Sequence, residues 1–219
     1  MKNRIFFAVA IALLFTTFNF SKQKNYIPKF KTEEIIIENN FILSDKKIKK
    51  QLSFLYQKNL FFVSAKEINQ KLNKLEFIDS LKVKKIYPNK IKIKIYEKKP
   101  IAVLNDKKEK FFLTDNNEVI NYSNIQKFEE LPIIFGNKES FEELNNSLND
   151  INFPKHEIST FLLFESGRWD LITKENKVIK LPIKNYKQSL ENFKILRNQN
   201  NLKKYKLFDY RISNQLILK

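Results

Sequence analysis

Few residues in this chain have the types and spacing that active-site chemistry requires. The 219 residues include no cysteine and a single histidine, His156, which excludes thiolate sites and the usual zinc sites. Two glycines are too few for a phosphate- or dinucleotide-binding loop, and Ser166-Gly167-Arg168 lacks the pattern of a nucleophile elbow. Acid–base chemistry would therefore depend on carboxylates alone.

Three aspartates, Asp115, Asp170 and Asp209, are the carboxylates to weigh first. Each falls in a predicted turn or strand, where a structural role is commoner, and the chain shows neither a nucleophile beside a base nor paired carboxylates in a cleft. His156 has no partner at ligand spacing and is predicted to be an ordinary residue at the entry of a strand. We therefore predict no catalytic residue, no cofactor site, no metal site and no enzymatic activity.

The remaining polar candidates suit recognition better than catalysis. Arg168 follows a predicted turn, and its planar guanidinium suits bidentate pairing, so we expect it to bind Asp209 or an external carboxylate. Asp209 and Arg211 lie two residues apart on one face of a predicted strand, where an ordinary cross-strand ion pair is the alternative to a binding role. Trp169 is expected to fill the core.

The charge of the chain is strongly positive, with 41 Lys and Arg against 24 Asp and Glu and a net charge of +17. Such a balance can attract nucleic acid or an anionic membrane. The lysines, however, alternate with apolar residues or lie on the polar faces of helices, without an arginine-rich or aromatic-interleaved motif. We expect a solvated surface and no nucleic-acid partner, and keep a basic membrane- or nucleic-acid-binding protein as an alternative.

The N-terminus predicts a membrane anchor. Residues 1–4 form a basic tail, and residues 5–21 are predicted to be a transmembrane signal anchor, followed by a linker over residues 22–31. The 16 uncharged residues from Ile5 to Phe20 would cover about 24 Å of a hydrocarbon core near 30 Å. A cleaved signal peptide is the alternative, although the small-x-small cleavage site is missing. The basic tail predicts an N-terminus in the cytoplasm and the bulk of the chain on the far side of an inner membrane.

Residues 77–100 have the clearest strand pattern. Apolar and basic residues alternate there with the period of a half-buried strand; these are Ile91, Ile93 and Ile95 with Lys90, Lys92 and Lys94. Leu81 and Val83 alternate with lysines earlier in the stretch, and Tyr87-Pro88-Asn89 supplies the turn. The pattern predicts a β-hairpin with one lysine-rich face.

The preceding residues predict the elements that cover this hairpin. Glu34–Glu38 is a β-branched strand, and Ser44 is a predicted N-cap for a helix over residues 45–57. A second helix is predicted to begin at Ser64–Glu67, which has the spacing of a capping box. The order strand, helix, helix, strand, strand defines a domain over residues 32–100.

Residues 101–219 predict an extended sheet with helices at its flank. The expected helices lie over residues 139–150 and around Tyr186–Leu196, and a hairpin surrounds Ser166-Gly167. The last strands are predicted over Tyr205–Ile212 and Gln215–Leu218. If the final strand is a sheet edge, its unpaired backbone groups offer a template for another chain.

The order β-α-α-β-β after an anchor resembles a POTRA domain, and several motifs resemble the bacterial cell-division family FtsQ/DivIB. Similar stretches run through nearly the whole chain: Glu76–Ile93, Glu97–Ala102, Phe112–Ile120, Leu131–Gly136, Ser166–Leu171 and Phe208–Arg211. Asn39-Asn40 and Asn116-Asn117 stand where the family has glycine, and asparagine tolerates the left-handed backbone that such turns need. The resemblance implies an α+β fold in which a transmembrane helix and a POTRA domain precede a domain of mostly antiparallel strands.

The resemblance also implies a function. The family forms a non-enzymatic scaffold of the divisome at the inner membrane of the septum, linking early and late division proteins, with FtsB- and FtsL-like proteins bound at the last strand. Carried over by position, the partner-binding residues would be Arg168, Arg211, Ile212, Ser213, Leu216, Ile217 and Leu218. The alternative from another class is a POTRA-containing periplasmic chaperone or translocation module, which would predict several POTRA repeats or a barrel.

Overall fold

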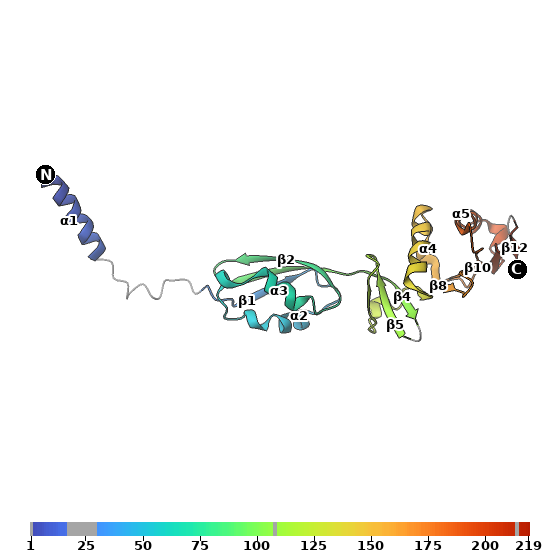
Figure 1. Ribbon diagram of the computed structural model, residues 1–219, viewed down its shortest axis with the longest axis horizontal. Coiled ribbons are helices and arrows are strands. Elements are labelled where there is room, and N and C mark those ends of the chain that lie inside the picture. Colours follow the sequence, from blue (N-terminus) through green and yellow to red (C-terminus); the bar gives the residue numbers. More distant parts are fainter. Residues whose placement is uncertain (1, 17–29, 107–108, 213–214) are drawn as a thin grey trace. The chain divides into compact units, whose positions relative to one another are not determined.

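The computed structural model describes residues 2–16, 30–106, 109–212 and 215–219. The chain divides into two compact units, Met1–Glu97 and Lys98–Lys219 (Figure 1). Together they form a mixed α+β protein whose strands belong to two separate sheets.

Helix α1 (Lys2–Thr16) covers most of the predicted anchor. Within the described residues, no helix is both long and apolar enough to cross a membrane. Residues 17–21 of the predicted span lie outside the described part of the chain, as does most of the predicted linker. The transmembrane span therefore stays a prediction.

The sheet of the first unit has the strand order β1-β3-β2. Strand β3 (Lys90–Glu97) lies in the centre, parallel to β1 (Glu34–Glu38) and antiparallel to β2 (Ile78–Ile86). The predicted hairpin is confirmed, because β2 and β3 pair along their length. The side chains of Ile91, Ile93 and Ile95 are fully buried, whereas the lysines between them remain partly or fully accessible.

Two short helices supply the apolar side chains that bury those isoleucines. Helix α2 (Asp45–Gln51) continues into the 3₁₀ helix η2 (Ser53–Leu55), and the 3₁₀ helix η3 (Leu60–Phe62) precedes α3 (Ala65–Leu72). The fully buried residues that they and the adjoining turns contribute are Ile48, Leu52, Leu55, Leu60, Ile68 and Leu72. The predicted order of elements is thus confirmed for this unit.

Two details of the predicted helices are corrected. The first helix ends at Gln51, short of the predicted residue 57, because the chain tightens into a 3₁₀ turn. Ser44 caps α2 as predicted, accepting from the backbone N of Lys47. Ser64 makes no side-chain cap hydrogen bond, so its predicted capping box is wrong. Glu67 binds the ammonium of Lys58 at 2.6 Å, and this charged donor competes with the backbone for the carboxylate.

The second unit is built on one sheet with the order β12-β11-β10-β9-β8-β7-β4-β5-β6. Its strands are β4 (Pro100–Asp106), β5 (Glu109–Thr114), β6 (Val119–Asn121), β7 (Ile133–Phe135), β8 (Ile158–Leu163), β9 (Trp169–Thr173), β10 (Val178–Lys180), β11 (Leu207–Asp209) and β12 (Ile217–Leu218). Most of the pairs between described strands are antiparallel, as expected, including the hairpin β8–β9 around Gly167. The parallel exceptions are β4–β7, β7–β8 and β10–β11.

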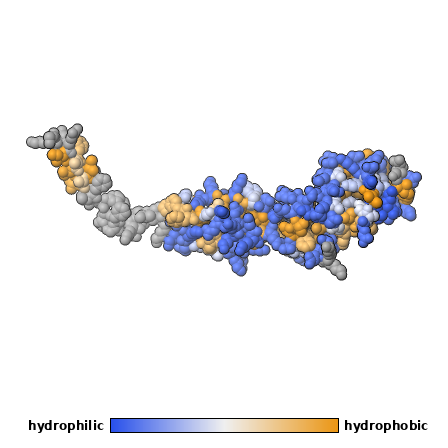
Figure 2. Space-filling model, in the orientation of Figure 1, coloured by the Kyte–Doolittle hydropathy of each residue, from blue (hydrophilic) through white to orange (hydrophobic). Residues whose placement is uncertain are grey.

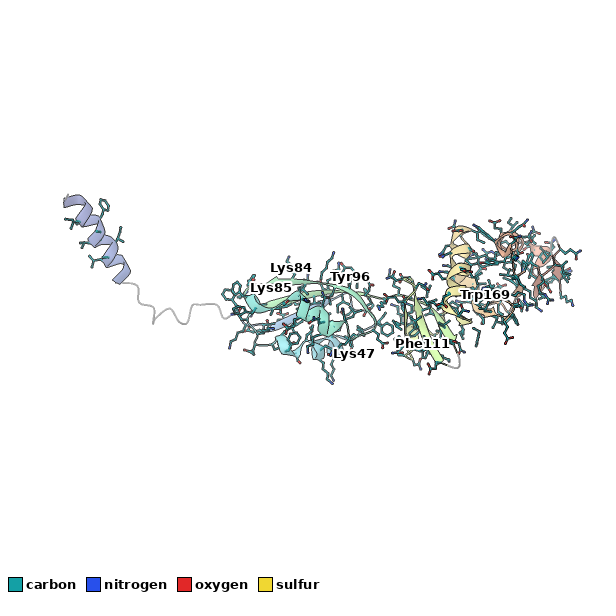
Figure 3. All side chains as sticks on the ribbon, in the orientation of Figure 1. Lys47, Lys84, Lys85, Tyr96, Phe111 and Trp169 are labelled. Carbon is teal, nitrogen blue, oxygen red and sulfur yellow. The ribbon has the colours of Figure 1, made fainter. Side chains whose placement is uncertain are left out.

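The core of the second unit lies between this sheet and helices α4 (Lys138–Asp150) and α5 (Tyr186–Leu196). Phe141 of α4 contacts the rings of Phe161 and Trp169, with centroids 5.2 and 6.3 Å away. Phe193 of α5 makes an edge contact with Phe208 at 5.0 Å. Trp169 is buried (Figure 3), so its predicted core position is confirmed.

Asparagines occupy the left-handed turn positions where glycine was expected. Asn39 has a φ of 65° at the end of β1, and Asn117 has a φ of 58° between β5 and β6. Asparagine reaches this region at lower cost than most residues with a side chain. The two turns therefore keep their geometry without glycine.

Candidate partner-binding edge

Strand β12 forms one edge of the large sheet. It pairs with β11 through Phe208 opposite Leu218 and Asp209 opposite Ile217. No strand among the described residues lies on its other side. Both final strands are shorter than predicted, since β11 covers only Leu207–Asp209 and β12 only Ile217–Leu218.

The hydrogen bonds of β12 fix which backbone groups face the open side. Leu207 and Lys219 exchange two backbone bonds, with N···O distances of 2.9 and 3.2 Å. In an antiparallel ladder such bonded pairs alternate with non-bonded pairs, so Phe208 and Leu218 form a non-bonded pair. The amide N–H and the carbonyl of Leu218 therefore face away from β11, toward the free edge.

Beside this edge, three charged residues lie in register across three strands. Lys180 on β10 is opposite Asp170 on β9 and opposite Asp209 on β11. Their neighbours Ile179 and Phe208 belong to the helix-covered core, so the charged row occupies the opposite face of the sheet. Both aspartates are buried, and a buried carboxylate must be paired to be tolerated.

Each aspartate is paired with the arginine two residues away along the chain. Arg168 donates from Nε to Oδ1 of Asp170 at 3.1 Å, and Arg211 donates from Nη2 to Oδ2 of Asp209 at 2.7 Å. The hydrogen bonds that Arg211 donates to Asp209 lower the pKa of that carboxyl, and the same bonds raise the pKa of Arg211.

The predicted pairing of Arg168 with Asp209 is therefore wrong. Asp209 and Arg211 do form an ion pair, the alternative to a binding role, but it runs along one segment of the chain and does not cross between strands. Strand β10 separates β9 from β11, which puts Asp170 and Asp209 about 10 Å apart, at roughly 4.8 Å per strand. Each arginine reaches the nearer carboxylate instead. Lys180 occupies the position between the two aspartates, and the strand register that puts it there could not be read from the sequence.

Both arginines line a groove of about 910 Å³ next to the edge. Its other lining residues come from the β8–β9 turn, the β10–α5 connection, α5 and the segment between β11 and β12, and include Ser166, Lys184, Ser189, Asn192, Tyr210, Ile212 and Leu216. The ring of Arg168's neighbour Phe164 lies 4.2 Å from the guanidinium carbon, which holds the side chain in place. Tyr210 donates to Oδ1 of Asn192 at 3.0 Å, and burial raises the pKa of its hydroxyl.

The structure brings most of the predicted partner-binding residues together. Arg168, Arg211, Ile212 and Leu216 line the groove, whereas Ile217 and Leu218 form β12 itself. Ser213 lies outside the described residues. A role of this set in binding a partner stays a prediction. Sequence reasoning missed Lys184, Asn192 and Tyr210, because only the fold places α5 beside the last strands.

The other candidate residues do not assemble into a reactive group in the described part of the chain. Asp115 lies in the turn after β5, where its backbone N donates to the carbonyl of Lys99 at 3.0 Å. His156 lies just before β8, as predicted; it is exposed, and its nearest carboxylate is that of Glu157 at 3.9 Å. No group of three or more metal-binding side chains occurs among the described residues.

Comparison with known proteins connects both units to one family. Residues 30–98 match the family model for the POTRA domain, FtsQ-type, and residues 102–211 match the model for the C-terminal region of cell division protein FtsQ/DivIB. The cell division protein FtsQ of Rickettsia typhi is 28% identical over 190 residues, which cover 85% of this chain and 71% of that protein. FtsQ of Rickettsia conorii is 29% identical with the same coverage.

A solved structure also resembles part of the chain. It is the major extracytoplasmic domain of the division protein DivIB from Geobacillus stearothermophilus, with a TM-score of 0.33 and 13% identity. The match covers 48% of this chain and 99% of that structure.

Proposed function

Because this chain belongs to the FtsQ/DivIB family of cell division proteins, we propose that it is a non-enzymatic scaffold of the divisome that captures partner proteins at the β12 edge. Membership of the family supports a role in division. The capture mechanism is supported by the geometry of the second unit, where an open strand edge and two arginines lie beside one groove.

The open side of β12 supports strand addition as the binding mode. An incoming extended segment would pair with the outward-facing N–H and carbonyl of Leu218, and main-chain hydrogen bonds of this kind provide affinity without requiring a particular sequence. The described strand is only two residues long. Backbone pairing on such a short strand is weak alone, so side-chain contacts must supply the remaining affinity and the register.

The groove can supply those contacts. Arg168 and Arg211 already hold buried carboxylates, and both line the groove, so they present positive charge in fixed positions. An incoming segment with acidic residues would be complementary to them. Apolar side chains of the segment could contact Ile212 and Leu216. These features fit an FtsB- or FtsL-like division protein with an acidic, strand-forming segment.

The proposed location follows from the same family. We place the chain in the inner membrane at the division septum through residues 5–21, with the N-terminus in the cytoplasm and both units in the periplasm. In this arrangement the FtsQ-type POTRA domain at residues 30–98 would contact other membrane proteins of the divisome.

Deleting Ile212–Lys219 from the full chain tests the function. Capture of an FtsB-like partner in a pull-down is expected to be lost, whereas the circular dichroism spectrum should keep the signal of both units. A fluorescent fusion should gather at the septum of dividing cells. Capture that persists after the deletion would refute the binding edge, and a fusion that stays evenly distributed would refute the divisome role.

A further inference from the structure

The first unit carries an exposed group of aromatic rings, which we call the aromatic patch: Phe30, Phe61, Phe62 and Tyr87. Phe61, Phe62 and Tyr87 are 56%, 76% and 51% exposed. The ring of Phe30 lies 4.8 Å from that of Phe61 and 5.9 Å from that of Tyr87, and the rings of Phe61 and Tyr87 are 5.4 Å apart. Figure 2 shows apolar side chains gathered at one end of the first unit, the end at which Figure 3 labels Lys85.

The patch is separate from the core of the unit. The isoleucines of β3, Ile48 of α2 and Leu72 of α3 are fully buried, and none of them belongs to the patch. Clustered apolar rings in water cost free energy, and such patches on soluble domains commonly mark a binding surface.

The patch lies where the chain enters the unit from α1. The backbone N of Leu60 donates to the carbonyl of Phe30 at 2.7 Å, which fixes the entry point beside the aromatic rings. Fourteen residue steps separate Thr16, the end of α1, from Phe30. A chain of that length spans at most about 50 Å. A bilayer that holds the N-terminal segment is therefore within reach of the patch.

The charges around the patch suit an anionic lipid surface. Lys85 donates to the carbonyl of Phe61 at 3.3 Å, and Lys31 is exposed next to Phe30. In the sequence, Lys22, Lys24 and Lys29 precede Phe30. The nearby acids have partners, because Glu34 binds Lys90 at 2.6 Å and Glu33 accepts from Asn89. Aromatic rings rimmed by lysines are typical of surfaces that rest at the headgroup level of a membrane.

We propose that the aromatic patch docks the first unit onto the anionic lipid headgroups of the membrane that anchors the chain. This inference rests on the membrane attachment proposed above, but not on partner capture by β12. Docking would fix the height and orientation of the POTRA domain above the bilayer, so that its remaining surfaces meet partners in a defined geometry.

Site-specific labelling tests the docking directly. The chain contains no cysteine, so Phe62→Cys can carry a single environment-sensitive fluorophore. Phe41→Cys provides the matched control, since Phe41 is 78% exposed in the same unit and its backbone N binds Glu97 at the far end of β3. Strand β3 places the two ends of the sheet about 23 Å apart, at roughly 3.3 Å per residue.

The full chain is reconstituted in vesicles that contain phosphatidylglycerol and spin-labelled lipid as a quencher. We expect the label at residue 62 to be quenched severalfold more than the label at residue 41, and less in vesicles of phosphatidylcholine alone. Equal quenching at both positions would overturn the inference. A label at residue 62 that is shielded from aqueous iodide but not quenched by lipid would also overturn it, because a protein surface would then cover the patch.

Flotation of the same samples separates this inference from the proposed attachment. A chain that does not float with the vesicles would remove the membrane attachment and the docking together. A chain that floats but shows equal quenching at both positions would remove the docking alone.

Discussion

Arg211 binds both carboxylate oxygens of Asp209: its Nε donates to Oδ1 at 2.9 Å, and its Nη2 donates to Oδ2 at 2.7 Å. The backbone N of Arg211 also donates to Oδ1, at 3.1 Å. This pair joins the end of β11 to the segment that leads to β12. It therefore links the stability of the edge to the arginine that lines the groove.

The pair predicts a pH dependence of stability. Hydrogen bonds from Arg211 place the pKa of Asp209 in the folded chain below its value in the unfolded chain, which is about 3.9. The stabilisation is thus complete above about pH 4 and is lost as the pH falls through the lower, folded pKa. The free energy of unfolding of the wild type should approach that of Asp209→Asn as the pH falls from 7 to about 2, measured by urea denaturation.

Asp150→Asn is the control for this titration. Asp150 binds Lys187 at 2.9 Å with 62% of its side chain exposed, and surface pairs of this kind contribute little. If the gap between wild type and Asp209→Asn stays constant over the whole pH range, the pair does not stabilise the fold in the way described.

Partner binding should depend on the shape of the Arg168 side chain as well as on its charge. Its guanidinium binds Asp170 through Nε and stacks on Phe164, and lysine can do only one of these. We expect Arg168→Lys to weaken the affinity for an acidic partner segment roughly tenfold although the charge is kept. Titration calorimetry measures this effect. Arg197→Lys is the control, because Arg197 binds Glu157 and does not line the groove; an equal loss in both variants would contradict a specific role for Arg168.

The backbone N–H of Leu218 should be needed for capture of the partner. Because this N–H faces the free edge, Leu218→Pro should remove a donor for the incoming strand without breaking a bond to β11. Partner capture should fall at least as far as in the Arg168→Lys variant. Leu218→Val keeps the N–H and should retain capture, as measured in the same pull-down. Normal capture by Leu218→Pro would show that strand addition is not the binding mode.

The packing of the second unit leaves no room for a side chain at Gly136. A Cβ at this position would lie 2.8 Å from the Cβ of Leu163 and 3.3 Å from the ring of Trp169. Gly136→Ala should therefore cost about 1–3 kcal/mol of unfolding free energy. A Cβ at Gly167 would meet no heavy atom within 4 Å, and asparagine tolerates its φ of 79°, so Gly167→Asn should change stability by less than about 0.5 kcal/mol. Thermal and urea unfolding of both variants will show whether the contrast holds.

Local patterns predicted the first unit well. The alternation of apolar and basic residues around Ile93 predicted both the strand and its buried face. Every second side chain of a strand points to the same face of the sheet, so the apolar set must be the buried one. The left-handed asparagines were also predictable, because their conformational preference is a property of the residue itself. The capping box failed at Ser64 because Lys58, six residues away, bound Glu67 instead.

The second unit was harder to predict because its arrangement depends on long-range pairing. Strand β7 was missed, since three residues between Pro132 and Gly136 are too few to show an alternation. Its parallel partners β4 and β8 are distant in the sequence. In the candidate site, too, local features could be predicted from the sequence and long-range pairing could not. Arg168 and Arg211 could be named from their motifs, but their carboxylates could not be assigned without the register of Lys180.

Amide hydrogen exchange at Leu218, in the full chain with and without an FtsB-like partner, tests the central claim most directly. If the partner adds a strand to β12, the exposed N–H of Leu218 becomes hydrogen-bonded, and its exchange should slow by at least tenfold in the complex. Unchanged exchange at Leu218 while the partner is bound would contradict capture at this edge.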